Sequence, residues 1–409
     1  MTTTTEHAAP TAADRAARAS CFAAFAIQGF MFASLITRLP TIKDRFDLSD
    51  YQVLAVLGAV SVMCAVGSVA AGYLAVRLGS ARVLRLALAA AAVCIAAVAL
   101  PGTLAVLLVV LGVYGLFVGA IDATMNMQGV GIQDRYGRSI MVGFHGMWSL
   151  GAVIGGVYAT ITIELDLPLL ATLLIVTAVA LLVVALLTRS LLAHALPDDA
   201  EGGLDDVGGR ASRDLLDHPT HHVPWVPVLL LAVPTFVMWF LDAATSAWGG
   251  IYLIDGLGSS DSAAPLAFTA YQLILLITRL LGDKVVRRYG ALATVRGSGV
   301  ICVVAVAMVV AAPSVGVAIA GFGLLGAGLA MIPPLSMVAA GHLDADGGGQ
   351  ALARVNVSNY VGYLVAALGI AIIAEQVSHR AMFVLPLVLA PVLVLMAGQF
   401  VPRTRSTTP

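Results

Sequence analysis

Polar and ionisable side chains inside long apolar segments are the residues of this sequence that could do chemistry. Asp122 and Asn126 lie four residues apart, so they share one face of an expected helix, and His145 and Ser149 repeat this spacing in the next apolar segment. An unpaired polar group inside a bilayer costs several kcal/mol and is rarely kept there without a task. Poor solvation at that depth favours the neutral form of a carboxylate, so Asp122 is a candidate for taking up and releasing a proton.

Each ionisable candidate also has a structural interpretation. Asp122 serves either proton transfer or a hydrogen bond to a neighbouring helix, and His145 serves either proton and substrate handling or an interhelical bond. Asp242 is either a proton acceptor near the outer mouth of a cavity or a helix-end residue that water reaches. These three residues are the proton-coupling candidates.

Neutral polar and aromatic residues are the substrate-binding candidates. A stripe with the spacing i, i+3, i+4 and i+7 near residue 360 must face protein or water rather than lipid, and a cavity wall accounts for it. Gln272 and Arg279 are seven residues apart on one face of another expected helix, where snorkelling explains the arginine. The full set is Gln28, Asn126, Trp148, Ser149, Gln272, Asn356, Asn359, Tyr360 and Tyr363.

These residues are positioned by membrane-spanning helices. Hydrophobic residues make up 60% of the 409 positions and charged residues 11%, which excludes a soluble globular domain. At about twenty apolar residues per crossing, the sequence predicts an all-α membrane protein with twelve transmembrane helices in two pseudo-symmetric six-helix bundles. The expected ranges are 20–38, 51–75, 83–100, 103–131, 140–162 and 168–188, then 226–250, 263–282, 292–312, 314–341, 351–375 and 381–400.

The spacing of these segments predicts the domain organisation. An N-terminal tail (1–19) precedes the first bundle (20–188), and a second bundle (226–400) ends in a short tail (401–409). The linker between the bundles (189–225) is rich in acidic residues and glycine, a composition that cannot bury a core. A cleaved signal peptide is not expected, because the apolar run after residues 1–19 is as long as a membrane span and no small-residue cleavage pattern follows it.

The distribution of lysine and arginine predicts the orientation. With a cytoplasmic N-terminus, most of these residues fall on the inner side, and only Arg38, Lys43, Arg45 and Arg380 fall on the outer side. The sequence therefore predicts a multi-pass protein of the cell (plasma) membrane, the inner membrane of a bacterium, with both termini in the cytoplasm.

A weak internal repeat supports two related halves. Basic turns that start and end with glycine follow the second and the eighth expected helix, at the same place in each set of six. Glycine allows a close approach of the turn, and arginine can bond the last carbonyls of a helix. A generic basic loop explains either turn alone, whereas two turns in register favour a structural gate. The gating candidates are Gly72, Arg77, Gly79, Arg82, Gly282, Asp283, Arg287, Arg288 and Gly290.

At these loops the chain resembles the major facilitator superfamily (MFS). The turn 72–82 is similar to the signature loop of that family, which normally has an aspartate where this chain has Val76. The segments 38–43, 126–128 and 144–151 resemble a group of poorly characterised bacterial transporters distantly akin to sugar permeases. The segment 151–156 resembles the end of the fifth-helix motif of drug/proton antiporters, with Ala152 in place of a proline. The resemblance implies two bundles around a central cavity that opens alternately to each side.

Other classes of function have little support. No metal site is predicted, because His218, His221 and His222 stand without a nearby cysteine or carboxylate pair, and no cofactor or nucleic-acid partner is predicted. An ATP motor is not expected, since no phosphate-binding glycine loop is present. An enzyme based on His145 is disfavoured, because no nucleophile and acid are arranged around it.

The sequence thus predicts a monomeric secondary active transporter for a small organic solute, coupled to protons. The motif fragment gives a slight preference for export of a drug or metabolite. The alternatives are proton-coupled uptake of a sugar-like solute and a non-transporting receptor that signals through the linker.

Overall fold

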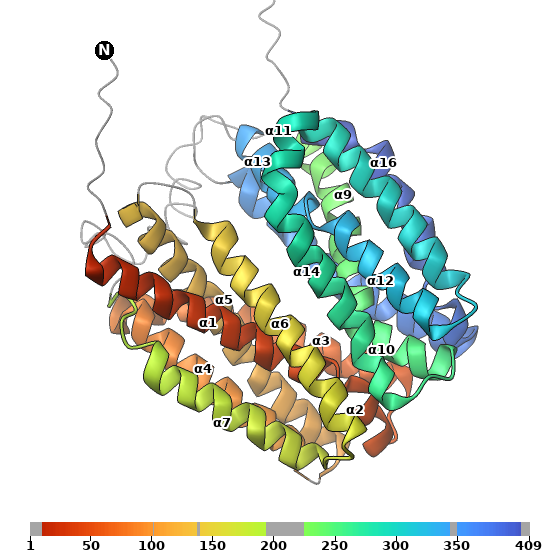
Figure 1. Ribbon diagram of the computed structural model, residues 1–409, viewed down its shortest axis with the longest axis horizontal. Helices are drawn as coiled ribbons and strands as arrows, with labels where there is room; N and C mark the ends of the chain where they lie inside the picture. The colour runs from red at the N-terminus through yellow and green to blue at the C-terminus, as the bar shows by residue number, and fades with distance from the viewer. Residues whose placement is uncertain (1–9, 101, 137–139, 194–224, 344–349, 402–409) are drawn as a thin grey trace, which may run out of the picture. The chain divides into compact units, whose positions relative to one another are not determined.

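The computed structural model describes residues 10–100, 102–136, 140–193, 225–343 and 350–401, and within these ranges all regular structure is helical (Figure 1). Ten helices are long and apolar enough to cross a membrane, and two shorter apolar helices span Val361–Gln376 and His379–Leu395. Together they account for the twelve helices expected from the sequence. Most of the predicted linker and the outermost parts of both tails, with His218, His221 and His222, lie outside the described residues.

The chain divides into two compact units. Unit 1 comprises Met1–Leu35, Ala59–Tyr158 and Leu165–Gly208, and unit 2 comprises Ile36–Gly58, Ala159–Glu164 and Gly209–Pro409. The segments 36–58 and 159–164 therefore cluster with the second half of the sequence, although they belong to helices of the first half. The bundle boundaries predicted from the sequence follow the linker instead, and they stay a prediction.

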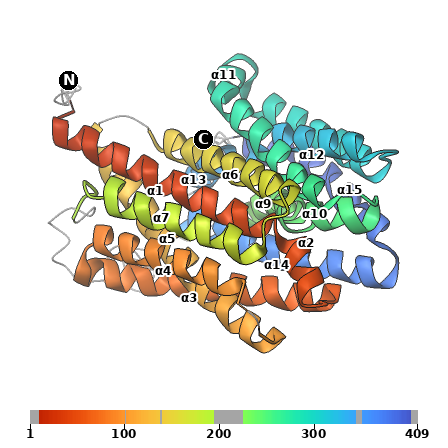
Figure 2. The same ribbon diagram turned by 60° about the horizontal axis from the view of Figure 1, so that its bottom comes forward.

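Unit 1 is built from six long helices, two of which, α3 and α6, extend into unit 2. In unit 1, α4 packs against α5 and α7, and α4 and α7 run side by side in both views (Figures 1 and 2). The helices are α1 (Ala12–Ile36), α3 (Asp50–Leu78), α4 (Ser80–Val98), α5 (Leu104–Tyr136), α6 (Met141–Glu164) and α7 (Leu169–Leu187).

Unit 2 contains the remaining elements. Its strongest packing is that of α11 on α12 and of α14 on α9. The elements are α2 (Leu39–Arg45), α9 (Trp225–Ala243), η2 (Ala244–Trp248), α10 (Gly249–Ile251), η3 (Tyr252–Gly256), η4 (Asp261–Ala263), α11 (Ala264–Val310), α12 (Val315–Leu329), α13 (Ile332–Leu343), α14 (Gln350–Gln376), η5 (His379–Ala381), α15 (Val384–Leu389), α16 (Pro391–Leu395) and η6 (Ala397–Phe400).

Several helices depart from the expected ranges. The eighth and ninth expected helices join as α11, with a break at Gly290, and the seventh continues past Ala243 into the π-helical segments η2 and η3. The twelfth divides at Pro391 into α15 and α16, because proline has no backbone N–H to continue the preceding turn. A short helix not expected from the sequence, α2, has Pro40 in its first turn. The missing N–H costs nothing there, because the N–H groups of a first turn have no partner within the helix.

Glycines bring α1 and α6 into close contact. A Cβ added to Gly29 of α1 would overlap the backbone carbonyl of Trp148, and a Cβ on Gly151 of α6 would overlap that of Ala26. One turn further, a Cβ on Gly155 would come within 2.6 Å of the Phe30 carbonyl oxygen. Small residues are the usual means of close helix packing in membranes, where hydrophobic exclusion does not drive helices together.

Close contacts at glycines recur in both units. Gly115 and Gly119 of α5 meet the backbone of α3, and Gly326 of α12 meets the Tyr271 carbonyl of α11. Gly321 and Gly328 also lie against α11. Gly112 differs, because a Cβ there would make only an ordinary contact with Met63, at 3.6 Å.

The Gln128 side chain of α5 bonds to the backbone just after α7, near the end of the described part of unit 1. The side chain is fully buried on α5, and its Nε2 donates to Ser80 Oγ at 2.8 Å and to the Leu192 carbonyl at 2.7 Å. Its Oε1 accepts from the Leu192 backbone N–H at 2.9 Å. Every polar atom of the buried amide group thus has a partner, which is the condition for a buried polar group to stabilise a fold.

The two repeated loops share one backbone feature. Gly79 has φ 81° and Gly290 has φ 76°, so each turn ends at a glycine in a region that other residues rarely adopt. Arg77, Arg82, Arg287 and Arg288, the basic residues of the loops, are exposed. The loops are alike in backbone as well as in sequence, whereas their gating role stays a prediction.

We expect alanine at Gly290 to destabilise the protein through backbone strain alone. A Cβ there meets nothing within 4 Å, so the cost is that of the positive φ, on the order of 1–3 kcal/mol. Gly297→Ala is the matched control: it lies on the same helix, is equally open and has no positive φ, and should be neutral or slightly stabilising. Thermal unfolding of the purified variants measures both, and equal melting temperatures would contradict the assignment of strain.

Candidate functional site

The most connected polar group inside a span of unit 2 is the Asp242 carboxylate. Asp242 lies near the end of α9 and is 9% exposed. The Tyr271 hydroxyl of α11 donates to its Oδ1, and the Tyr363 hydroxyl of α14 donates to its Oδ2. Three helices that are distant in sequence are therefore joined at one carboxyl group, and each of its two oxygens has a hydrogen-bond donor.

The backbone next to Asp242 is irregular. The α-helix gives way directly after Ala243 to the π-helical segment η2, which contains Ser246 and Trp248. Such π-helical turns are found frequently at functional sites. The Trp239 ring lies beside the Tyr363 ring, with centroids 6.0 Å apart, and adds an aromatic surface to the group.

Two further polar atoms of these helices have no partner among the described residues. Gln272 is 3% exposed, and its Oε1, an acceptor, makes no hydrogen bond to the described chain. The indole N–H of Trp239 is a buried donor that likewise has no hydrogen-bond partner among the described residues. Buried polar atoms are nearly always satisfied in folded proteins, so a bound molecule with both donor and acceptor groups would complete this region.

We expect Tyr363→Phe and Tyr271→Phe each to destabilise the protein. Each substitution removes one hydroxyl donor from a buried carboxylate, and a hydrogen bond to a charged group contributes about 1.5–3 kcal/mol. Tyr289→Phe, at an exposed tyrosine of α11, is the control and should leave the melting temperature unchanged. If the three variants melt alike, the hydroxyls do not hold Asp242 as described.

Asp122 has a different environment. Its side chain lies on the surface of unit 1 and makes no hydrogen bond or ion pair to the described residues. It shares a face of α5 with Gly115 and Gly119, which pack on α3, and the Cys64 thiol and the Tyr114 hydroxyl lie near the carboxylate. Asn126 does not pair with the carboxylate, because its Nδ2 donates to the Asp122 backbone carbonyl at 2.8 Å.

Four other candidates gather where α1 meets α6. The Trp148 indole N–H donates to Gln28 Oε1, so these two predicted residues are each other's partners. The His145 ring packs edge-on against the Phe25 ring, with centroids 5.4 Å apart, which agrees with the interhelical interpretation. Ser149 is fully buried, and its hydroxyl has no partner among the described residues.

The remaining candidates are placed only in part. Asn359 is half-buried on α14, one turn from Tyr363. The side chains of Asn356, Tyr360 and Asp283 lie outside the described residues. Gly282 packs on Met331, whereas Gly72 has open space around it.

Sequence reasoning missed the partner of Asp242 and a set of charges elsewhere. Tyr271 precedes Gln272 in α11, and no pattern within α9 or α11 alone indicates that its hydroxyl meets Asp242. Lys43, Asp50, Asp255 and His379 form a charge cluster that no single segment reveals. In the part of the chain that the structure describes, no group of three or more His, Cys, Asp or Glu residues is arranged to hold a metal ion.

Twelve apolar helices in two related sets, with ionisable groups inside the spans, define a polytopic membrane transporter. The family model of the Major Facilitator Superfamily matches residues 5–156, 134–346 and 235–409, which together cover nearly the whole sequence. The chain therefore belongs to the Major Facilitator Superfamily.

Curated relatives extend over most of the chain. An uncharacterised MFS-type transporter of Yersinia pestis is 28% identical over 364 residues, covering 88% of this chain and 89% of the relative. An uncharacterised transporter of Sinorhizobium fredii is 26% identical, and the match covers 91% of this chain and 96% of the relative. The membrane protein MosC of Rhizobium meliloti is 27% identical, with 94% and 90% covered.

Solved structures share the fold at low sequence identity. The nucleoside transporter NupG superposes with a TM-score of 0.70 at 13% identity, covering 95% of this chain and 98% of that one. The MFS transporter FucP, in the outward conformation, gives a TM-score of 0.61 at 16% identity, with 94% and 99% covered. At these identities the likeness concerns the fold alone.

Proposed function

We propose that this protein is a secondary active transporter that moves a small, hydroxylated organic solute by alternating access, with proton coupling through Asp122. It acts as a monomer in the cell membrane, with both termini in the cytoplasm. Membrane transport as such follows from membership of the family. The coupling ion, the solute and the direction are the content of the proposal.

The contrast between the two intramembrane aspartates carries the proposal. Asp242 accepts hydrogen bonds from two tyrosine hydroxyls, so both of its carboxyl oxygens already have partners. Asp122 has no hydrogen-bond or ion-pair partner among the described residues, so a proton can be added or removed without breaking an existing bond. An ionisable side chain on that surface must meet water or protein, because exposure to lipid costs several kcal/mol. Asp122 is therefore the better proton carrier, and Asp242 the better anchor for the substrate-binding region.

The chemistry around Asp242 supports a neutral, hydroxylated solute. A buried acceptor on Gln272, a buried donor on Trp239 and an aromatic surface suit a molecule with several hydroxyl groups and an apolar ring face. Two fold neighbours are in keeping with this class, since FucP is a fucose:proton symporter and NupG is a nucleoside transporter. Their low identity leaves the specific solute to experiment.

Transport into proteoliposomes with an imposed pH gradient tests the proposal. A panel of labelled hexoses, deoxyhexoses and nucleosides is offered with the gradient in each direction and with no gradient. We expect uptake of at least one member to exceed its equilibrium level only when a gradient is present, and an ionophore that collapses the gradient to abolish the excess.

The same experiment distinguishes the directions. Accumulation towards the alkaline side indicates proton-coupled uptake, which the likeness to a symporter favours, and accumulation towards the acidic side indicates exchange and hence export, which the sequence slightly favoured. If every solute equilibrates without regard to the gradient, proton coupling is wrong.

A further inference from the structure

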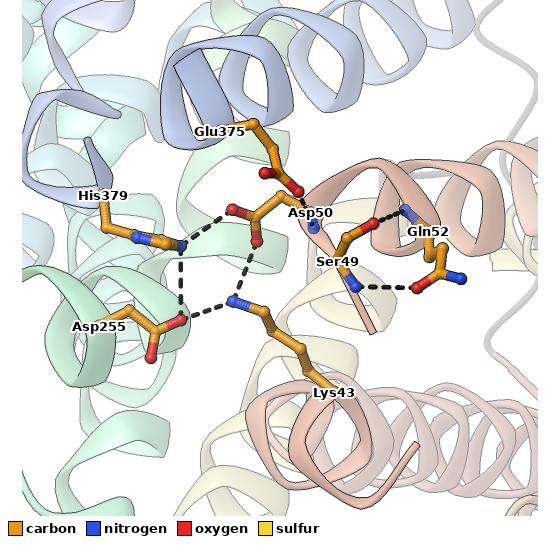
Figure 3. Close-up of polar contacts among 7 residues, drawn as sticks. All are labelled: Lys43, Ser49, Asp50, Gln52, Asp255, Glu375 and His379. Atoms are coloured by element: carbon orange, nitrogen blue, oxygen red, sulfur yellow. Dashed lines mark hydrogen bonds and ion pairs between the residues drawn. The ribbon is translucent and has the colours of Figure 1, made fainter. Parts of the chain in front are cut away.

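A cluster of five ionisable residues fastens the connection between α2 and α3 within unit 2 (Figure 3). Lys43 Nζ lies 3.0 Å from Asp50 Oδ1 and 2.6 Å from Asp255 Oδ2. His379 Nε2 lies 2.9 Å from Asp50 Oδ2 and 3.6 Å from Asp255 Oδ2. The Asp50 backbone N–H donates to Glu375 Oε1 at 2.8 Å. We call these residues, Lys43, Asp50, Asp255, Glu375 and His379, the Lys43 cluster.

The Lys43 cluster joins parts of the chain that are far apart in sequence. Asp50 begins α3, where Ser49 and Gln52 form a reciprocal capping box with bonds of 2.9 and 3.3 Å (Figure 3). Asp255 lies in η3 and His379 in η5. A neighbouring bond from Gln376 Nε2 to the Tyr51 hydroxyl, 2.9 Å long, links the same segments.

Charge within the Lys43 cluster is unbalanced. Asp50, Asp255 and Glu375 carry three negative charges when ionised, and Lys43 carries one positive charge. Water screens this imbalance of charge only weakly, because the Asp50 side chain is 3% exposed and that of Lys43 is 13% exposed. Protonation of His379, whose side chain is 31% exposed and thus reachable by water, adds a second positive charge directly between two carboxylates.

The neighbouring charged residues do not supply the positive charge that a protonated His379 brings to the two carboxylates. Asp44 of α2 interacts with Asp255 and Lys43 of the cluster and with Asp261 of η4, and both aspartates add negative charge. Arg380, beside His379 in η5, is directed to another partner, since its Nη2 donates to the Ala312 carbonyl at 3.2 Å. His379 is the histidine among these groups, and histidine is the side-chain type that can change its charge near neutral pH.

We propose that His379 is a proton sensor that fastens the segment 36–58 to η3 and η5 when it is protonated. Protonated His379 gives Asp50 and Asp255 a charge-assisted contact, and neutral His379 leaves them to share Lys43. The fastened arrangement is therefore favoured as the pH falls and is loosened as the pH rises. Under the predicted orientation the cluster faces the outer compartment, so this device responds to external acidity. It is independent of any proton that the transport cycle itself carries.

Hydrogen–deuterium exchange of the purified, full-length protein tests the sensor. Peptides from 36–58 are followed at about pH 5.5 and about pH 8, on either side of the histidine range, after correction for the intrinsic pH dependence of exchange. We expect protection to be greater at the lower pH by a factor of at least about ten, the effect of one hydrogen bond to a charged group. Equal protection at both values, or greater protection at the higher pH, would overturn the proposal.

Three variants separate a sensor from a merely structural histidine. His379→Gln should show weak protection at both pH values, and His379→Lys, which keeps a positive charge, should show strong protection at both. His218→Gln, which changes a histidine of the predicted linker, should behave as the unmodified protein. If His379→Gln keeps the full pH difference, another group is the sensor. The readout does not require transport, so its outcome is separate from that of the proposed function.

Discussion

Asp122→Asn is expected to abolish the response of transport to an imposed pH gradient. Asparagine keeps the size and hydrogen-bonding capacity of the side chain but cannot take up a proton, so solute can no longer accumulate above equilibrium. Exchange of labelled for unlabelled solute across the membrane should persist, because it requires the moving helices but no net proton movement. Gradient-driven accumulation and exchange are measured in the same proteoliposomes.

Asp242→Asn provides the comparison for this result. Asp242 is held by two tyrosine hydroxyls and is proposed to position the substrate-binding region, so its amide variant should bind solute more weakly and yet remain sensitive to pH. A variant of Asp122 that keeps an unchanged pH dependence, or a variant of Asp242 that alone loses it, would transfer the coupling role to Asp242.

Gly151→Leu is expected to cause a large loss of stability in unit 1. Even a Cβ at this position would overlap the Ala26 carbonyl, and the obstacle is backbone that cannot rotate away. The helices α1 and α6 would have to separate, which also strains the bond between Trp148 and Gln28. Overpacking of this kind costs roughly 1–3 kcal/mol and more where the backbone must move.

Gly112→Leu on α5 is the control for that prediction. Its nearest neighbour is the flexible Met63 side chain at 3.6 Å, so we expect a much smaller change. Melting temperatures of the purified proteins, compared at equal detergent concentration, measure both effects. If Gly151→Leu and the unmodified protein have the same melting temperature, close contact between α1 and α6 does not hold unit 1 together.

Local patterns predicted the helices and many of the polar positions, because hydropathy and spacing are properties of a single segment. Glycines such as Gly119 and Gly326 were expected to allow close packing, and the repeated loops end at Gly79 and Gly290, whose positive φ values require glycine. The family followed from motifs that lie within one or two helices.

Pairings between segments could not be predicted in the same way. Gln28 and Trp148 were both candidates, but nothing in either helix indicates that they bond to each other. Tyr271 was missed because its role depends on Asp242, 29 positions away. The π-helical turn after Ala243 has no sequence signature, since it arises from the packing around it.

The amide of Gln128 has a practical consequence for work on this transporter. By binding both backbone groups of Leu192, it clamps the chain immediately after the sixth helix of unit 1. A load applied further along the chain is therefore borne by Gln128 and α5, and it does not pull directly on the end of α7. A fluorescent reporter inserted beyond Ala193 would leave the end of α7 undisturbed, which makes this a suitable position for a fusion.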